Sequence, residues 1–328
     1  MDDTGGGTAT NGNWAAVADT SWYDSSLSTF TLNRPEQLAG LAELVNNGQV
    51  SAARAAGPVD FTGKTITLTA DIDLSGKEWT PIGDSGNPFG GTFDGGGHTI
   101  SNMTITQETQ ITRGQYGFFS FTGNATTVKN IRLTGVNIMI DDAISVNGGV
   151  INVGCVTSSN SGTVTNCEVS GSITASSPGY INVGGVIGTN GGTVTDCETS
   201  VSVTASTFGS NNNAIPYAGG LIGYTAGGTV TDCKASGSVT ASNSSSYSYA
   251  VAGGLIGYYI GGVLEDCDAS GRVTATATRT GYAGGLIGAI YTAAGGGIKN
   301  NTFSVSGTGQ YSGVGLGGYT YDQITSRP

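Results

Sequence analysis

The sequence is poor in charge, histidine and proline. Only 11% of its 328 residues are charged, and it has one histidine and seven prolines; about a quarter of the residues of an ordinary globular domain are charged. Its net charge of −11 excludes a protein that binds nucleic acid through an extended basic face. No apolar run approaches the roughly 18–20 residues that cross a bilayer, so we expect a chain that does not span a membrane.

The residues that catalysis or metal binding would need are equally scarce. One histidine, His98, leaves no Ser–His–Asp set to nominate, and no Cys/His cluster has zinc-ligand spacing. The carboxylates available to a polysaccharide lyase or glycosidase are Asp71, Asp73, Asp84 and Asp94. They fall in turn-like sequences such as DIDLSG and FDGGG, and we interpret them as turn residues and His98 as an outward, solvated side chain. We therefore predict no catalytic residues, no cofactor and no metal ligands.

Glycine, in contrast, is abundant, and the chain repeats itself. Four copies align on a cysteine: GTVTNCEVSGSITAS (162–176), GTVTDCETSVSVTAS (192–206), GTVTDCKASGSVTAS (228–242) and GVLEDCDASGRVTAT (262–276). A second block precedes each copy: VGCVTS (153–158), VGGVIG (183–188), AGGLIGY (218–224) and AGGLIGY (252–258), with a further AGGLIGA at 283–289. A period near 30 residues without helical periodicity is typical of units that bury their apolar faces only by stacking on their neighbours.

Alternation of apolar and polar residues gives the fold class. GGLIGY is predicted as one short strand, GTVTDCKA as a second that bends at the Asx residue, and GSVTAS as a third. We predict an all-β fold, a right-handed parallel β-helix (β-solenoid) of seven or eight coils with about three short strands per coil. The paired glycines fit places where backbones pass closely or where φ is positive.

The cysteines define a column of core residues. With the weaker copies of the repeat, this column is Met103, Ile131, Cys167, Cys197, Cys233 and Cys267. In-register residues on adjacent coils lie about 4.8 Å apart, which is wider than the roughly 3.8 Å between the Cβ atoms of a relaxed disulfide. We therefore expect free, buried thiols.

An Asx column precedes the cysteines and marks a bend, where a short polar side chain can bond to its own backbone. Its members are Asn102, Asn130, Asn166, Asp196, Asp232, Asp266 and Asn300. The three stacked aspartates repel one another unless they are hydrated or bridged by a cation such as calcium. Because the nine-residue calcium repeat of β-rolls is absent, we favour hydrated bends.

The N-terminal region differs from the repeats. LNRPEQLAGLAELVNNG (32–48) predicts an amphipathic helix at about 34–47, with Asn33 as N-cap, Glu36 three residues later and Pro35 in the first turn. This helix would cover the open end of the first coil. We divide the chain into a disordered or linker start (1–21), an N-terminal cap (22–60), a parallel β-helix (61–310) and a C-terminal cap or tail (311–328).

Six tyrosines are the candidate ligand-binding residues, because exposed rings at coil spacing can stack on sugar faces or bury in a protein partner. They are Tyr217, Tyr224, Tyr247, Tyr249, Tyr258 and Tyr282. The alternative is aromatic packing that closes the corners of the coils. Outward threonines form flat columns like those of ice-binding solenoids, but Val263 and Glu265 interrupt these columns. We therefore explain the threonines by their preference for β-strands and by solubility.

Several of these segments resemble a known family. GLIG at 220–223, 254–257 and 285–288, with GVIG at 185–188, is similar to the GLUG motif of bacterial surface and secreted proteins. PEQLAGLAELVNNG, TADIDLSGKEWTPIG and FGGTFDGGGHTISNMTI resemble the region that precedes this motif in adhesin-like proteins of gut and oral bacteria. Similar repeats occur in bacterial immunoglobulin A peptidases, outside their catalytic domains. The resemblance covers roughly residues 20–305.

The resemblance implies a non-catalytic, adhesin-like protein at the bacterial cell surface or outside the cell, whose rigid β-helix binds a host or microbial glycan or protein. The start, MDDTGGGTATNG, lacks the features of a secretory signal, and no wall anchor is present, so we expect an excised ectodomain. We also expect a monomer that binds no nucleic acid. The alternatives are a secreted polysaccharide-active β-helix enzyme and a pure structural spacer.

Overall fold

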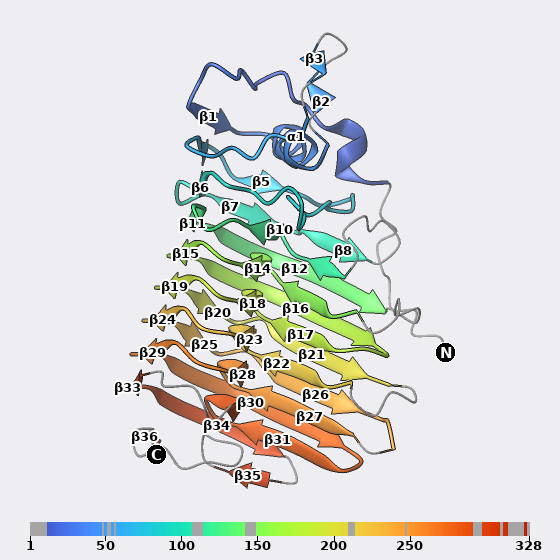
Figure 1. Cartoon of the computed structure of the whole chain (residues 1–328), viewed down its shortest axis with the longest axis vertical. Coiled ribbons are helices and arrows are strands. Elements are labelled where there is room, and N and C mark those ends of the chain that lie inside the picture. Colours follow the sequence, from blue (N-terminus) through green and yellow to red (C-terminus); the bar gives the residue numbers. More distant parts are fainter. Residues whose placement is uncertain are drawn as a thin grey trace, which may run out of the picture.

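The structure, a computed structural model, describes residues 12–47, 49–50, 54–55, 57–106, 114–141, 149–208, 214–246, 248–290, 297–308, 311–313 and 325–326. Its strands stack in sequence order along one long axis, with the one α-helix of the described residues at the N-terminal end (Figure 1). The coil-to-coil pairings of four sheets are parallel. The predicted parallel β-solenoid is therefore confirmed, with about seven turns. Its right-handedness stays a prediction.

The four sheets are numbered here in the order in which one repeat crosses them. Sheet 1 contains β1 (Thr29–Leu32), β4 (Thr65–Leu68), β6 (Thr92–Asp94), β11 (Thr127–Lys129), β15 (Thr163–Thr165), β19 (Thr193–Thr195), β24 (Thr229–Thr231), β29 (Val263–Glu265) and β33 (Ile298–Lys299). Sheet 2 contains β5 (Ile72–Asp73), β7 (Thr99–Ser101), β8 (Thr104–Thr106), β12 (Arg132–Asp141), β16 (Glu168–Ser177), β20 (Glu198–Thr199), β21 (Ser202–Thr207), β25 (Lys234–Ala235), β26 (Val239–Asn243), β30 (Asp268–Ala277), β34 (Thr302–Thr308) and β36 (Thr325–Ser326).

The GLIG segment of each repeat supplies the other two sheets. Sheet 3 contains β9 (Gln115–Tyr116), β13 (Ile151–Gly154), β17 (Ile181–Gly184), β22 (Pro216–Gly219), β27 (Tyr249–Gly253), β31 (Thr280–Gly284) and β35 (Tyr311–Gly313). Sheet 4 contains β10 (Phe119–Thr122), β14 (Thr157–Asn160), β18 (Ile187–Asn190), β23 (Ile222–Thr225), β28 (Ile256–Tyr259) and β32 (Ile287–Ile290). A short antiparallel pair, β2 (Gln49–Val50) and β3 (Arg54–Ala55), lies outside the four sheets.

A coil therefore crosses more strands than the three that we predicted. The GLIG block, predicted as one strand, is two strands, because Gly220 and Leu221 form a turn between β22 and β23. The same two-residue turn recurs between β27 and β28 and between β31 and β32.

Close backbone approach explains the glycines of this turn. A Cβ on Gly219 would overlap with the carbonyl oxygen of Ile222, three residues later in the same coil. A Cβ on Gly220 would overlap with the carbonyl oxygen of Gly254 in the next coil, and one on Gly223 would lie 2.5 Å from the amide nitrogen of Val183 in the preceding coil. These three glycines are absent from the positions with positive φ, so of the two reasons considered for the paired glycines, close packing applies here.

Positive φ belongs instead to the Asx column. All seven of its members are left-handed, with φ between 50° and 59°, a conformation that Asn and Asp tolerate better than other residues with a Cβ. Asn166 donates from Nδ2 to Oδ1 of Asn130 (2.7 Å), and Asn130 donates to Oδ1 of Asp94 (2.8 Å). These amides therefore bond to the neighbouring coil, whereas we predicted bonds to their own backbone.

One hydrophobic core runs from Trp14, which precedes the N-terminal cap, to Phe303 in β34. Identical or similar side chains stack in register within it: Val164 pairs with Val194 and Val194 with Val230. Full burial of a side chain of this size contributes about 1.5–3 kcal/mol. Each coil obtains that burial mainly from its two neighbours, so the array is stable only as a stack.

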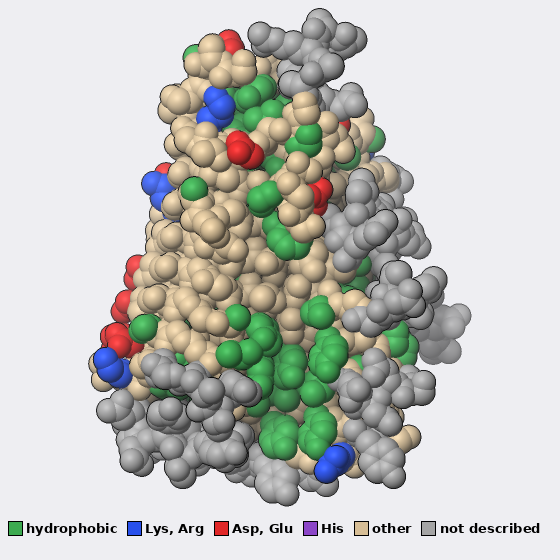
Figure 2. Space-filling model, in the orientation of Figure 1, with side chains coloured by type: hydrophobic (Ala, Val, Ile, Leu, Met, Phe, Trp, Pro, Cys, Tyr) green, Lys and Arg blue, Asp and Glu red, His purple; other side chains and the backbone are tan. Residues whose placement is uncertain are grey.

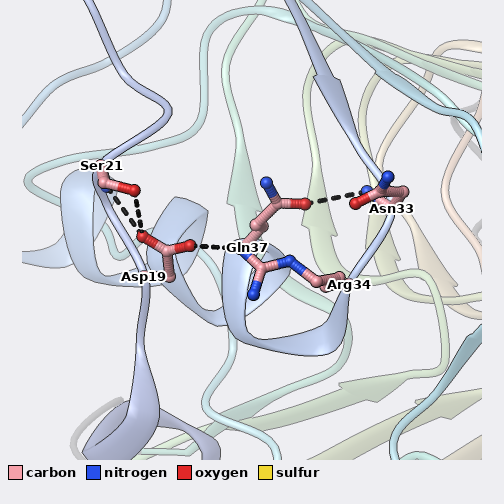
Figure 3. A network of polar contacts seen from close by, with 5 residues as sticks. All are labelled: Asp19, Ser21, Asn33, Arg34 and Gln37. Atoms are coloured by element: carbon pink, nitrogen blue, oxygen red, sulfur yellow. Dashed lines mark hydrogen bonds and ion pairs between the residues drawn. The ribbon is translucent and has the colours of Figure 1, made fainter.

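The N-terminal cap contains α1 (Pro35–Asn46), which buries Leu38, Leu41 and Leu44 in this core. The predicted N-cap is wrong by one residue: Arg34 precedes the helix, and its side chain makes no capping hydrogen bond. Instead, Gln37 in the first turn accepts a hydrogen bond from the backbone N–H of Asn33 (3.0 Å) (Figure 3). The Asn33–Glu36 capping box therefore does not form.

An ion pair holds the segment before the helix. Arg34 Nη2 lies 2.7 Å from Oδ2 of Asp19, whose Oδ1 accepts hydrogen bonds from the hydroxyl and the backbone N–H of Ser21 (Figure 3). These contacts, with those from Ser21 the strongest, lower the pKa of Asp19.

Residues 12–21 are not the linker start that we predicted. The 3-10 helix η1 (Trp14–Val17) buries Trp14, whose Nε1 donates to the carbonyl of Leu74 (3.0 Å). The solenoid itself also begins earlier than residue 61, because β1 already pairs in parallel with β4. Most of the predicted C-terminal cap or tail (311–328) lies outside the described residues, and β35 within it extends sheet 3.

Candidate functional site

The turn between sheets 3 and 4 places two outward columns beside each other along the solenoid. The column on sheet 3 is Asn152, Asn182, Tyr217, Val251 and Tyr282, which follow one another in register. The column on sheet 4 is Ser159, Thr189, Tyr224, Tyr258 and Ala289. Amide and hydroxyl side chains thus occupy the N-terminal part of both columns, and aromatic rings the part that follows.

Three of the six candidate tyrosines form one cluster. Tyr217 stacks on Tyr258, with ring centroids 4.8 Å apart and planes at 27°. Tyr224 joins them, at 6.2 Å from Tyr217 and 5.6 Å from Tyr258. All three side chains are half-buried, so each ring both packs against its neighbours and exposes part of its surface.

Hydrogen-bonded side chains continue the site toward the N-terminus. Asn182 Nδ2 donates to Oδ1 of Asn152 (2.7 Å), and the hydroxyl of Thr189 donates to the same oxygen (2.7 Å). Asn152 Nδ2 in turn donates to Oε1 of Gln115 (3.1 Å). The amides therefore form a chain along the axis in which every donor points toward the N-terminal end.

A groove of about 630 Å³ joins the amides to the tyrosines. Its lining residues are Val150, Asn152, Tyr180, Asn182, Thr189, Tyr217, Tyr224, Tyr258 and Ile260. None of these nine is charged, although the chain carries a net charge of −11. Figure 2 shows a cluster of hydrophobic side chains, with tyrosine counted among them, over the coils in which Figure 1 places β22, β27 and β28.

Burial changes the ionisation of two of these phenols. It raises the pKa of Tyr217, and the nearby phenols of Tyr258, Tyr180 and Tyr224 add to this effect. Burial also raises the pKa of Tyr224. Burial therefore favours the neutral, hydrogen-bonding form of the Tyr217 and Tyr224 phenols.

The other candidate tyrosines lie elsewhere. Tyr249 and Tyr282 stack with centroids 6.1 Å apart and planes at 11°, and the guanidinium carbon of Arg279 lies 5.2 Å from the centroid of Tyr249. This pair is separate from the groove lining. Tyr247 lies outside the described residues.

The polar half of the groove is not among the residues that we predicted from the sequence. Asn152 and Asn182 occupy the repeat position of Tyr217 and Tyr282, and Thr189 occupies that of Tyr224 and Tyr258. Comparing the outward positions of INVG with those of PYAG would have found them. Tyr180 and Ile260 lie outside the strands and gave no such signal.

The carboxylates weighed for catalysis hold turns. Asp73 accepts hydrogen bonds from Asn102 and Ser75, and Asp84 accepts them from the backbone N–H groups of Gly86 and Asn87. Asp94 accepts hydrogen bonds from Asn130 and from the backbone of Gly96.

Asp71 and His98 form a separate pair at the surface. Asp71 accepts a hydrogen bond from the backbone of Thr99 (2.9 Å) and lies 3.4 Å from Nδ1 of His98. The hydrogen bond from Thr99 does most to lower the pKa of Asp71. This carboxylate is exposed on the surface and does not line the groove.

Within the part of the chain that the structure describes, no group of three or more His, Cys, Asp or Glu side chains could hold a metal ion. The strand register stacks Asp196, Asp232 and Asp266 on successive coils. Thr195 donates its hydroxyl to Asp196 (3.2 Å). This row therefore lacks the convergent ligands of a built cation site.

The predicted core column is buried throughout. Met103, Ile131 and the four cysteines Cys167, Cys197, Cys233 and Cys267 are at most 2% exposed, and none of the cysteines forms a disulfide. Cys233 Sγ lies 3.1 Å from the carbonyl oxygen of Thr231, and Cys267 Sγ lies 3.2 Å from that of Glu265. Burial also raises the pKa of the fifth thiol, Cys155.

The fold and this repeating turn define a class, that of β-solenoid repeat proteins. The family model described as the GLUG motif matches residues 216–240 and 248–274. The chain thus carries the GLUG motif in these two segments, which include the strands that hold the tyrosine cluster.

Two curated proteins share sequence with part of the chain. A "Putative Gly-rich membrane protein" of Evansella cellulosilytica is 38% identical over 105 residues, which are 32% of this chain and 11% of that protein. Halomucin of Haloquadratum walsbyi is 31% identical over 118 residues, which are 32% of this chain and 1% of halomucin. The chain therefore matches only a small part of either relative. None of the helices in the described residues has the length and apolar character of a membrane crossing.

One solved structure matches over most of the chain. It is titled as that of a "putative immunoglobulin A1 protease" from Bacteroides ovatus and is 18% identical in sequence. The TM-score is 0.58, and the match covers 93% of this chain and 85% of that one. At this identity the likeness shows a shared fold.

Proposed function

We propose that the protein is a non-catalytic, adhesin-like β-solenoid of the bacterial cell surface or extracellular space, and that it binds a host or microbial glycan or protein through the groove between sheets 3 and 4. The observation that carries this proposal is the joining of Tyr217, Tyr224 and Tyr258 to a row of amides in one uncharged groove. Half-buried tyrosines combine a large apolar surface with a polar tip, which suits them to recognition.

The groove also has the character of a binding site rather than that of a reaction centre. Its volume of about 630 Å³ lies within the roughly 300–1,000 Å³ of small-molecule sites. Its lining holds no carboxylate, histidine, lysine or cysteine, which are among the commonest groups of general acid–base and nucleophilic catalysis. The names of the two curated relatives are compatible with an extracellular or surface setting for the GLUG repeats.

The test is binding to arrays of glycans and of extracellular proteins. We expect the chain to bind members of at least one array, and a variant with both Tyr224→Ala and Tyr258→Ala to lose that binding while its circular dichroism spectrum is unchanged. Tyr249→Ala is the matched control, because it removes a half-buried tyrosine that lies outside the groove. Binding that survives the double substitution would contradict the proposal.

Two other functions are separated by direct assays. A polysaccharide-active enzyme would release new reducing ends or unsaturated products from a panel of polysaccharides, and we expect none. A pure spacer would bind neither array.

A further inference from the structure

The chain of amides ends at Asn182, on the coil next to Tyr217, in an acceptor that no described residue bonds to. Gln115, Asn152 and Asn182 follow one another in register, and each amide donates to the one before it. The side-chain hydrogen bonds of Asn182 use only its Nδ2 group, which donates to Asn152 and to Thr189 (3.3 Å). Among the described residues, its Oδ1 receives no hydrogen bond, and its register partner on the next coil is Tyr217.

The direction of this chain matters for the chemistry of a ligand. Hydrogen bonds in series polarise one another, so the last acceptor of the series is strengthened. A hydroxyl group that enters the groove can donate to this oxygen. A ligand for this position therefore needs a donor at one point and an apolar face beside it, where the rings of Tyr217 and Tyr258 lie.

The absence of charge from the groove narrows the ligand further. An anionic ligand would enter a chain of net charge −11 and find no Lys or Arg in the lining to pair with. A protein partner of ordinary affinity needs a patch of about 800 Å² on each side, whereas this site is a groove of small-molecule size. The hydroxyl groups of an uncharged sugar can bond to the amides of the groove, and its C–H faces can stack on the tyrosine rings.

The site is also elongated. Asn152, Asn182 and Tyr217 on sheet 3, together with Tyr258 on sheet 4, occupy successive coils. With about 4.8 Å between coils, the lining extends for roughly 14 Å along the axis. A monosaccharide would cover only part of that length, whereas a short oligosaccharide laid along the axis would contact both the amides and the rings.

We propose that the ligand is a neutral oligosaccharide bound lengthwise, with sugar faces on Tyr217 and Tyr258 and with one hydroxyl group donating to Oδ1 of Asn182. This assignment rests on the proposed function and names the chemical class of the ligand. It makes Asn182 a binding residue and gives the ligand a direction relative to the solenoid axis.

The test uses the whole chain and an array printed with neutral cello-, manno-, xylo- and galacto-oligosaccharides and with acidic oligogalacturonate, sialylated and sulfated oligosaccharides. The strongest binder is then titrated by calorimetry. We expect neutral oligosaccharides to bind and acidic ones not to bind, with the corresponding monosaccharide much weaker than the oligosaccharide.

Three variants test the contacts. Tyr258→Ala should weaken binding at least tenfold, whereas Tyr258→Phe, which keeps the ring, should stay within about twofold. Asn182→Leu removes the acceptor at similar volume and leaves Asn152 Oδ1 with the hydroxyl of Thr189, so we expect the fold to persist and binding to fall three- to tenfold. Tyr249→Ala should change nothing.

Stronger binding of acidic than of neutral oligosaccharides would overturn the assignment. So would an affinity for neutral oligosaccharides that is the same in Tyr258→Ala, Asn182→Leu and the unchanged protein. If no glycan binds but an extracellular protein does, and Tyr258→Ala abolishes that binding, the proposed function stands and the sugar assignment fails. If neither class of ligand binds, both fail.

Discussion

The ring of Tyr217 in β22 stacks on the ring of Tyr258 in β28, one coil further along the solenoid, at a centroid distance of 4.8 Å. The two residues come from different sheets and from different copies of the repeat. Their contact therefore depends on the turn at Gly220–Leu221, which brings sheet 4 beside sheet 3.

This contact has a spectroscopic consequence. Burial raises the pKa of Tyr217 above its usual value, which is about 10. Because the folded protein holds the proton more tightly than the unfolded chain, the stability from this site is present below about pH 10 and is lost as the pH rises further. We expect alkaline titration followed by phenolate absorbance to show a late phase whose amplitude is smaller by one phenol in Tyr217→Phe. An equal number of late-titrating phenols in both proteins would contradict this assignment.

Gly220, the first glycine of GLIG, should not accept a larger residue without a loss of stability. A Cβ on Gly220 would overlap with the carbonyl oxygen of Gly254 and lie 3.0 Å from Cβ of Ala235. We expect Gly220→Ala to lower the free energy of unfolding by about 1–3 kcal/mol, as overpacking does. Urea unfolding followed by circular dichroism measures this.

The matched control is Gly57→Ala, because nothing lies within 4 Å of a Cβ at Gly57. That substitution should be neutral or stabilise the protein by up to about 1 kcal/mol. Equal effects of the two substitutions would show that steric overlap is not the reason for glycine at 220.

Replacing a left-handed aspartate of the Asx column by asparagine should increase the thermal stability of the protein. Asp232 has φ of 56° and lies between Asp196 and Asp266 on the adjacent coils. Asp232→Asn keeps the tolerance for this conformation and removes two like-charge neighbours, so we expect a higher midpoint of thermal unfolding, with the gain shrinking as salt screens the charges.

Asp232→Ala tests the conformational part of the same argument. It removes the charge as well, but alanine in the left-handed region costs about 1–2 kcal/mol. We expect Asp232→Ala to be less stable than Asp232→Asn at every salt concentration. The reverse order would contradict the importance of the left-handed turn.

Acid should weaken the first coils before the later ones. Hydrogen bonds from Asn102 and Ser75 lower the pKa of Asp73, and similar contacts lower that of Asp94 against the effect of its burial. A carboxyl group whose native pKa is lowered contributes stability above its unfolded value of about 3.9, and this contribution is lost as the pH falls through the native value. Hydrogen exchange measured from pH 5 downward should therefore show β5 and β7 losing protection before β19 and β24.

Asp73→Asn checks the origin of this effect. Asparagine keeps an oxygen that can accept from the backbone N–H of Ser75 but has no carboxyl group to protonate. The variant should lose part of the pH dependence in the first coils. An unchanged acid profile would show that Asp73 does not contribute to it.

Much of the fold could be predicted because the repeat itself reports the register. The spacing of Cys167, Cys197 and Cys233 identifies residues that face the core on successive coils, and the Asx residue before each cysteine marks a bend. Hydrophobic alternation could not show that GLIG holds a turn, because Leu221 and Ile222 are two apolar residues in succession. The reason for glycine at 219 and 220 is the close approach of backbone carbonyl oxygens, which appears only in the structure.

The site was less predictable than the fold. Tyr217, Tyr224 and Tyr258 were selected as aromatic residues near GLIG, but only the register separates them from Tyr282. Val251 stands between Tyr217 and Tyr282 on sheet 3, and Ala289 follows Tyr258 on sheet 4. The polar half was missed because Asn182 and Thr189 look like ordinary strand residues until the register sets them beside the rings. The N-cap was displaced because Gln37, rather than Glu36, reaches back to Asn33.

The identical register of neighbouring coils has an evolutionary consequence. Because Val194, Val230 and their counterparts occupy equivalent positions, duplicating one complete repeat within the gene would insert a coil whose two faces already fit those on either side. Such an event would lengthen the rod by about 4.8 Å and extend the row of side chains beside the GLIG turn. Reach and recognition surface can thus grow together through recombination, without a new fold.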